Sequence, residues 1–101
     1  MTHIRQPDEC TTMAEVRFGV DAVDRELIAL LGRRFGYMRA AARIKHERGQ
    51  VRDEERKAQV IAQAREEAAR LGIPDALVAD LWERLVEGSI AYELERFDRR
   101  T

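Results

Sequence analysis

Apolar residues recur along the first half of the chain in steps of four and three residues. Such spacing places side chains on one side of a helix and is typical of the core-facing seam of a helical bundle. The seam comprises Val16, Val20, Val23, Leu27, Leu30, Arg34, Met38, Ala41 and Lys45. Arg34 and Lys45 are therefore cations on an otherwise apolar seam, where an unpaired buried charge would be very costly. No carboxylate shares the seam, so the counter-ion is either a ligand or an acid from another helix.

The same type of pattern continues beyond the seam and predicts an all-α protein. We expect a single domain over 1–101, with a polar arm over 1–12 and helices over about 13–48, 53–71 and 74–98. At about 1.5 Å per residue the first helix would be roughly 50 Å long. Two shorter helices of the same chain cannot cover its whole seam, so the length favours self-association.

Five residues indicate where these helices begin and end. Thr12 and Glu15 fit a capping box at the start of the first helix. Gly49 is a natural C-terminal stop for that helix, and Gly72 is one for the second. Asp53 carries a carboxylate that suits the N-terminus of the second helix.

The composition narrows the class of protein. Charged residues make up 37% of the 101 residues but nearly cancel, giving a formal net charge of −1. A general nucleic-acid-binding domain would carry a basic excess, so no nucleic-acid partner is expected. Cys10 is the only cysteine, which rules out an intrachain disulfide and favours a reducing compartment. No apolar run reaches transmembrane length and no secretory signal is evident, so we expect a cytoplasmic protein without a membrane partner.

The two seam cations are the first candidates for chemistry. Arg34 and Lys45 are eleven residues apart, so on a helix they project within roughly 20° of each other and lie about 16 Å apart along the axis. That separation suits opposite ends of a small polyanion. The alternative is that both side chains reach the surface or pair with acids from other helices.

The third predicted helix offers a complementary feature. One of its sides carries Trp82, Val86, Ser89, Glu93 and Phe97, which places Ser89 and Glu93 one turn apart between large apolar groups. Burial favours the protonated form of a carboxyl group, and a neighbouring cation opposes this. Glu93 is therefore either a functional group or one half of a structural ion pair with an arginine.

Other catalytic groups are scarce. Neither histidine has a Cys or a second His at the spacing of metal ligands, and Cys10 has no evident base partner. Gly-rich phosphate loops are also absent. We therefore expect no metal and no cofactor. If the site is catalytic, its reaction proceeds through electrostatics and conformational restraint and not through a covalent intermediate.

Three runs together resemble the all-helical chorismate mutase family: VRFGVDAVDRELIALLGRRFGYMRAAARIK, VRDEERKAQVI and VEGSIAYEL. The resemblance covers residues from about 14 to 97. The arm sequence QPDECT is similar to that of the related isochorismate-pyruvate lyases, which share the fold and the site.

The resemblance implies an interlocked homodimer with two equivalent sites and a small dicarboxylate substrate, chorismate or isochorismate. Arg17 matches an arginine that is donated to the site of the partner chain. Arg34 and Lys45 match the cations that hold a substrate carboxylate and the region of the ether oxygen. Arg17 and Arg34 diverge by about 100° on a straight helix, which agrees with their serving different sites.

The resemblance assigns further roles to the second and third helices. Asp53 matches a loop position that contacts the substrate hydroxyl, and Arg56 matches a second carboxylate-binding arginine. Ser89 matches another carboxylate contact. Glu93 matches the Gln or Glu that hydrogen-bonds the ether oxygen, and only its protonated form could donate that bond. Lys57 departs from the family pattern, because some members place there a Glu that contacts the hydroxyl.

The function implied first is that of a chorismate mutase, an isomerase of aromatic amino acid biosynthesis in the shikimate pathway. It converts chorismate to prephenate by a unimolecular pericyclic rearrangement. A second possibility is an isochorismate-pyruvate lyase that gives salicylate and pyruvate. A third, from another class, is a helical dimerisation module that retains the fold without catalysis.

Overall fold

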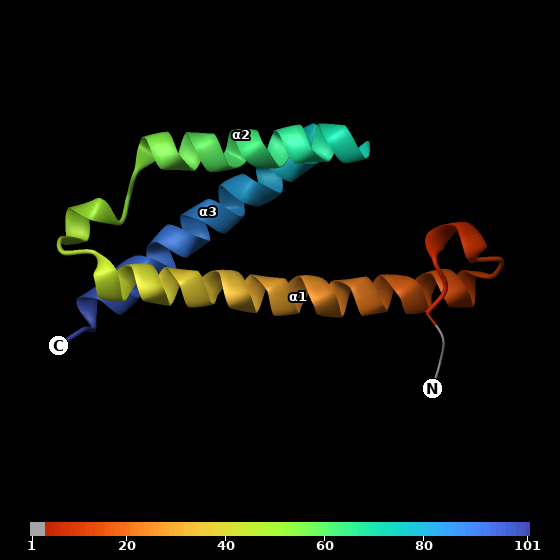
Figure 1. Cartoon of the computed structure of the whole chain (residues 1–101), viewed down its shortest axis with the longest axis horizontal. Coiled ribbons are helices and arrows are strands. Elements are labelled where there is room, and N and C mark those ends of the chain that lie inside the picture. Colours follow the sequence, from red (N-terminus) through yellow and green to blue (C-terminus); the bar gives the residue numbers. More distant parts are fainter. Residues whose placement is uncertain (1–3) are drawn as a thin grey trace. The chain divides into compact units, whose positions relative to one another are not determined.

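The computed structural model describes residues 4–101, so the first three residues of the predicted arm lie outside it (Figure 1). The described chain is all-helical and contains no strand, which confirms the predicted fold class. Its elements in order are η1 (Pro7–Glu9), α1 (Met13–Ile44), η2 (Arg48–Gln50), α2 (Glu54–Leu71) and α3 (Asp75–Asp98). The contacts group into two units, Met1–Gly36 and Tyr37–Thr101, whose boundary falls inside α1.

In the first unit, the predicted capping box opens α1. The Thr12 hydroxyl accepts from the backbone N–H of Glu15 at 3.2 Å, and the Glu15 carboxylate accepts from the backbone N–H of Thr12 at 3.1 Å. The same carboxylate accepts from the backbone N–H of Thr11 at 3.0 Å, which is the main cause of the lowered pKa of Glu15. Arg5 adds an ion pair to it at 3.1 Å. These contacts therefore hold the arm against the first turn of α1.

The first helix ends at Ile44, before the predicted limit near residue 48, and that prediction is corrected. The reason is a side-chain cap beyond the helix. The Gln50 side-chain oxygen accepts from the backbone N–H groups of His46 and Glu47 at 2.9 and 3.0 Å, which turns the chain into the 3₁₀-helix η2. Gly49 lies inside η2 and is not the residue that stops α1.

Both ends of α2 lie where the sequence predicts them. Asp53 caps its N-terminus, because the carboxylate accepts from the backbone N–H of Arg56 at 3.0 Å. Gly72 ends it with φ of 73°, a left-handed conformation that a residue with a Cβ adopts only at a cost. After this turn α3 runs back along α2, and the two helices pack against each other (Figure 1).

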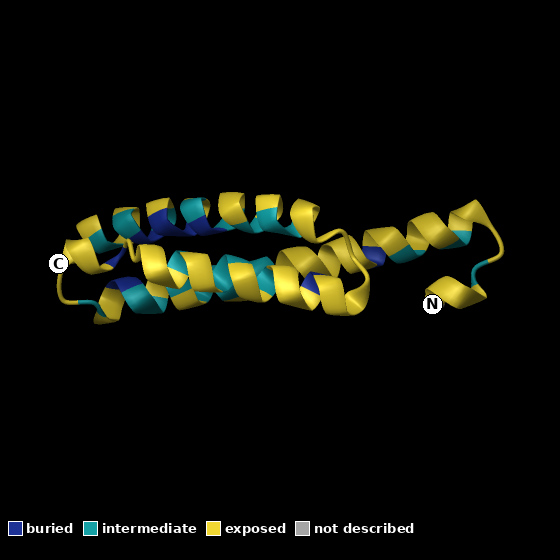
Figure 2. Ribbon diagram, turned by 90° about the horizontal axis from the view of Figure 1, so that it is seen from above, coloured by how far each residue is buried: buried dark blue, intermediate teal, exposed yellow. Residues whose placement is uncertain are grey.

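The apolar core of the second unit lies between α2, α3 and the segment that precedes α2. Val51, Val86 and Ile90 are buried, and the half-buried Val60, Trp82 and Leu94 pack around them. The side of α3 that the sequence singled out is thus the buried one, and most of the remaining helical surface is exposed (Figure 2). The core is small, so polar contacts between the helices matter to this unit.

Such contacts form a charged cluster beside the core. Lys57 on α2 donates to Glu83 and Glu87 of α3, each at 2.8 Å, and Arg52 pairs with Glu87 at 2.8 Å. The hydrogen bond from Arg52, followed by that from Lys57, lowers the pKa of Glu87 to about 2. Hydrogen bonds to Glu83 and Glu87 raise the pKa of Lys57 to about 12. The cluster therefore binds α2 to α3 through charges on both helices.

We predict that acid removes the contribution of Glu87 to stability. Its pKa is lower in the folded chain than the ordinary 4.5, so the stabilisation is fully present above about pH 4.5 and is lost as the pH falls toward 2. The urea midpoint of Glu87→Gln should therefore lie below that of the wild type at pH 7, and the gap should close as the pH falls. Glu66→Gln, which removes an exposed carboxylate from α2, is the control and should show no such gap. A gap that stays constant from pH 7 to pH 3 would contradict the role of the Glu87 charge.

Candidate functional site

The centre of the predicted site is an ion pair between the end of α1 and α3. Lys45 directly follows α1, and its backbone N–H continues the helical pattern by donating to the carbonyl of Ala41 at 2.9 Å. Its Nζ lies 2.7 Å from Oε2 of Glu93, whose side chain is only 6% exposed. Of the two counter-ions that the sequence left open for Lys45, the structure contains the acid from another helix. The partner of Glu93 is this lysine and not the arginine that the sequence suggested.

Ser89 lies one turn before Glu93 on the same buried side of α3. Its hydroxyl donates to the carbonyl of Leu85 at 2.7 Å, a bond within its own helix. Every buried side-chain nitrogen or oxygen in the described part of the chain has a hydrogen-bond partner. The structure thus pairs Lys45 with Glu93 next to the apolar core, and Ser89 lies one turn away on the same buried side of α3.

Arg100 is a residue that the sequence reasoning missed. Its Nη1 donates to the carbonyls of Ala42 and Lys45 at 2.8 and 2.5 Å, and its guanidinium lies 3.8 Å from the centre of the Phe97 ring. The last carbonyls of a helix have no partner within the helix, so a cation there satisfies them and favours the helix dipole. Arg100 therefore fixes the backbone from which Lys45 projects. The only signal in the sequence was a basic residue near the chain end.

Asp53 and Arg56 lie at the start of α2, and both are exposed. The Asp53 carboxylate is occupied by its capping bond, and Nη1 of Arg56 donates to the side-chain oxygen of Gln59 at 2.6 Å. Within residues 4–101, neither side chain forms an ion pair or hydrogen bond with Lys45 or Glu93. Lys57, the departure from the family pattern, is occupied by Glu83 and Glu87.

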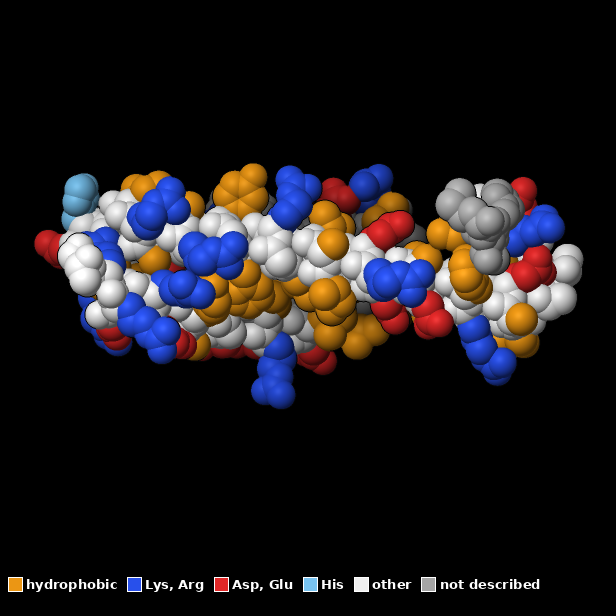
Figure 3. All heavy atoms as spheres, turned by 90° about the horizontal axis from the view of Figure 1, so that it is seen from below, with side chains coloured by type: hydrophobic (Ala, Val, Ile, Leu, Met, Phe, Trp, Pro, Cys, Tyr) orange, Lys and Arg blue, Asp and Glu red, His pale blue; other side chains and the backbone are white. Residues whose placement is uncertain are grey.

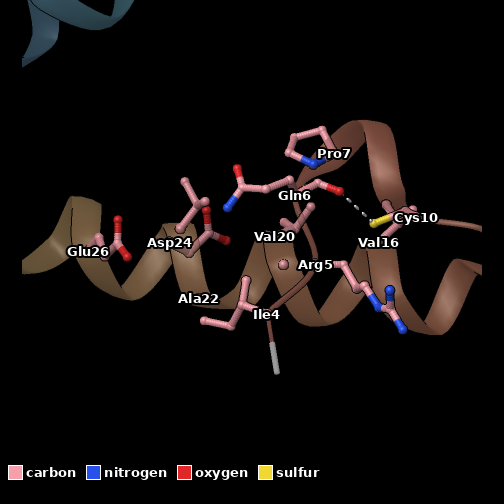
Figure 4. Close-up of a pocket in the computed structure, with 12 residues that line it drawn as sticks. Ile4, Arg5, Gln6, Pro7, Cys10, Val16, Val20, Ala22, Asp24 and Glu26 are labelled. Atoms are coloured by element: carbon pink, nitrogen blue, oxygen red, sulfur yellow. Dashed lines mark hydrogen bonds between the residues drawn. The ribbon is translucent and has the colours of Figure 1, made fainter. Parts of the chain in front are cut away.

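The two remaining predicted residues, Arg17 and Arg34, belong to α1 in the unit Met1–Gly36. Arg17 is exposed and Arg34 is half-buried. That unit has a hollow of its own, of about 490 Å³, between the arm and α1. Ile4, Val16 and Val20 line it with acidic and basic neighbours, and the thiol of Cys10 donates to the carbonyl of Gln6 at its edge (Figure 4). Neither Arg17 nor Arg34 lines this hollow.

The described residues contain no group of three or more His, Cys, Asp or Glu side chains placed to hold a metal ion. None of the helices in the described range is long and apolar enough to cross a membrane. Ion pairs and hydrogen bonds are the interactions that the structure shows at the candidate site.

Comparison with known proteins gives two matches. The chain is 27% identical over 92 residues to an isochorismate pyruvate lyase of Pseudomonas aeruginosa, an alignment that covers 91% of each chain. The sequence profile of the family chorismate mutase type II matches residues 16–94, a range that begins just before Arg17 and ends just after Glu93. With Lys45 and Glu93 paired on an all-helical frame, the chain belongs to the chorismate mutase type II family.

Proposed function

We propose that this chain is a chorismate mutase, which rearranges chorismate to prephenate in aromatic amino acid biosynthesis. The observation that carries the proposal is the 2.7 Å contact between Lys45 and the buried Glu93, inside a chain of this family. It places an ammonium group and a carboxyl group together beside an apolar core. Such a pair can stabilise charge that develops on a neighbouring oxygen.

The reaction requires two things of the protein: restraint of the substrate conformation and electrostatic stabilisation of developing charge. One C–O bond breaks while one C–C bond forms within the same molecule, and negative charge develops on the ether oxygen. We assign Lys45 to that oxygen, because a cation where charge grows stabilises the transition state more than the ground state. Arg34, Arg56 and Ser89 are the proposed contacts of the two substrate carboxylates. No cofactor is required for this chemistry.

Recognition of the substrate hydroxyl is proposed for Asp53. Its carboxylate already caps α2, so a hydroxyl donor would share an oxygen with the helix or use the second one. Lys57 supplies no carboxylate at the neighbouring position and is held by Glu83 and Glu87. We therefore assign the acceptor for the hydroxyl at this end of α2 to Asp53.

An isochorismate-pyruvate lyase is the second candidate, and the similarity to the Pseudomonas aeruginosa enzyme favours it. Its reaction breaks the same type of ether bond but moves a hydrogen from the ring to the departing enolpyruvyl group. Charge develops on the ether oxygen in both reactions, so Lys45 and Glu93 suit either one. The choice between them depends on which ring isomer the site holds in a reactive conformation.

We further propose that the functional form is a homodimer in which Arg17 acts in the site of the partner chain. The support is the exposure of the predicted seam. Val20, Val23 and Leu27 are each more than half exposed in the single chain, as are Ile28 and Leu30. An apolar face of this extent on one helix marks an interaction surface. A second copy of the same helix offers the matching apolar face under two-fold symmetry.

The decisive test is to incubate the purified protein with chorismate and with isochorismate separately. We expect prephenate from chorismate; salicylate and pyruvate from isochorismate alone would establish the lyase instead. Lys45→Met should lower kcat/KM by roughly 10²–10³-fold, because it removes the cation from the ether oxygen. Arg70→Met is the control, since it removes one charge at the far end of α2 where Arg70 pairs with Glu67. No turnover of either substrate would leave the dimerisation module as the surviving interpretation.

The second prediction concerns Glu93. Only the protonated form of a carboxyl group can donate a hydrogen bond to the ether oxygen. If Glu93 is that donor, kcat/KM should fall as the pH rises. Glu93→Gln donates at every pH, so its profile should be flatter over the same range. Identical profiles for the two proteins would contradict the proposed role.

The third prediction tests the donation of Arg17. Arg17→Ala and Lys45→Met should each be nearly inactive alone. After the two are unfolded and refolded together, half of the dimers are mixed and each mixed dimer regains one intact site, so about a quarter of the wild-type activity should return. Lys45→Met mixed with Glu93→Ala is the control, because these two residues act in one chain and no intact site can form. A mixture with Arg17→Ala that stays inactive would place Arg17 in the site of its own chain.

A further inference from the structure

A second hollow, of about 360 Å³, lies where the C-terminal ends of α1 and α3 meet. One alanine and five arginines line it: Arg39, Ala42, Arg43, Arg96, Arg99 and Arg100. We call it the arginine hollow. Its lining contains no carboxylate from the described part of the chain, although the chain as a whole carries a net charge of −1. Figure 3 shows several basic side chains gathered toward this end of the molecule.

Two of the arginines are held by one tyrosine. Nη1 of Arg39 donates to the Tyr92 hydroxyl at 2.9 Å, and the guanidinium of Arg96 lies over the Tyr92 ring, 5.2 Å from its centre. The hydrogen bond from Arg39, followed by the charges of Arg39 and Arg96, lowers the pKa of Tyr92 below its ordinary value of 10. The phenol therefore experiences the positive field of the hollow, and it keeps two guanidinium groups from dispersing into solvent.

Two more arginines are anchored by α1 and α3. Arg100 is held by the carbonyls of Ala42 and Lys45 and by the Phe97 ring. Arg99 pairs with Glu95 at 2.9 Å. Within residues 4–101, Arg99 is the one member of the five that forms an ion pair with a carboxylate. Four of the five arginines are thus held by contacts within the chain, and a single acid, Glu95, neutralises one of them.

This arrangement differs from an ordinary solvated basic surface. Long arginine side chains at a surface usually move apart and are screened by salt, but contacts with Tyr92 and Phe97 hold three of these together. A guanidinium group keeps its charge and has five N–H donors, of which Arg39 gives one to Tyr92. The free donors match the paired oxygens of carboxylates and phosphates. Because the groups are already ordered, a ligand would lose less entropy on binding.

The volume of the hollow limits the size of the anion that it can bind. Its volume lies near the lower end of the range for small-molecule sites, roughly 300–1,000 Å³. A nucleic acid would need a longer basic surface than these five residues provide. We propose that the arginine hollow binds a small polyanion with at least two carboxylate or phosphate groups, at a site separate from Lys45 and Glu93. The proposal does not depend on the function proposed above.

The test uses isothermal titration calorimetry on the full chain with inorganic pyrophosphate and with citrate, at 150 mM KCl. At least one of the two should bind with one site per chain. Arg43→Gln/Arg96→Gln should weaken that binding about tenfold or more, since two charges are lost from the lining. Arg25→Gln/Arg84→Gln removes the same total charge from exposed positions on α1 and α3 and should bind as the wild type does. Arg43→Gln alone leaves the Tyr92 contacts intact and should also weaken binding, which separates a binding effect from a folding defect.

Lys45→Met distinguishes this site from the proposed active site and should bind the anion unchanged. Binding that is lost in Lys45→Met but kept in Arg43→Gln/Arg96→Gln would overturn the proposal, because the anion would then occupy the active site. Equal binding by the two double variants, or no binding of either anion, would also overturn it. So would binding of a single-stranded oligonucleotide alone, since that would identify an extended basic surface.

Discussion

A buried carboxylate needs a cation, and in this chain that constraint joins the end of α1 to α3. Glu93 is almost fully enclosed, so the ammonium of Lys45 at 2.7 Å is the contact that makes its burial tolerable. Lys45 in turn depends on where α1 ends. That end is set by Arg100, which satisfies the last carbonyls, and by Gln50, which turns the chain away. One ion pair therefore links the helix boundary, the packing of α3 and the candidate site.

Two groups of cations in the second unit differ in what holds them. Lys45, Lys57 and Arg52 each face a carboxylate, and these pairs bind helices to one another. Three arginines of the hollow, Arg39, Arg96 and Arg100, are held by aromatic side chains and backbone carbonyls, which fix their positions without neutralising them. A cation that pairs with a carboxylate stabilises the fold, whereas an ordered cation without a counter-ion is suited to binding an anionic ligand. In the proposed reaction Lys45 would serve both purposes, because it pairs with Glu93 in the fold and would contact the ether oxygen of the substrate.

The length of α1 sets the remaining constraint. A helix of 32 residues presents more apolar surface than α2 and α3 of one chain can cover, and the exposure of Val20, Val23 and Leu27 is the result. Burying that surface against a second copy would stabilise the fold, since apolar burial contributes roughly 25 cal/mol per Å². The same association would bring a basic residue such as Arg17 to another chain. In this proposal, association with a second copy both buries the hydrophobic seam and completes the site.

The sequence by itself determined the all-helical class, the long first helix, the capping roles of Thr12, Asp53 and Gly72, and the buried side of α3. These are local properties, because helical period and cap chemistry depend on residues a few positions apart. It also singled out Lys45 and Glu93, since a charge on an apolar stripe is visible in the pattern. Only the tertiary structure decided that these two pair with each other, that Glu87 lies opposite Lys57 and Arg52, and that Arg100 satisfies carbonyls at the end of α1. Such contacts join residues about 30 to 60 positions apart, and the register between helices that creates them is set by packing and leaves no periodic signal in the sequence.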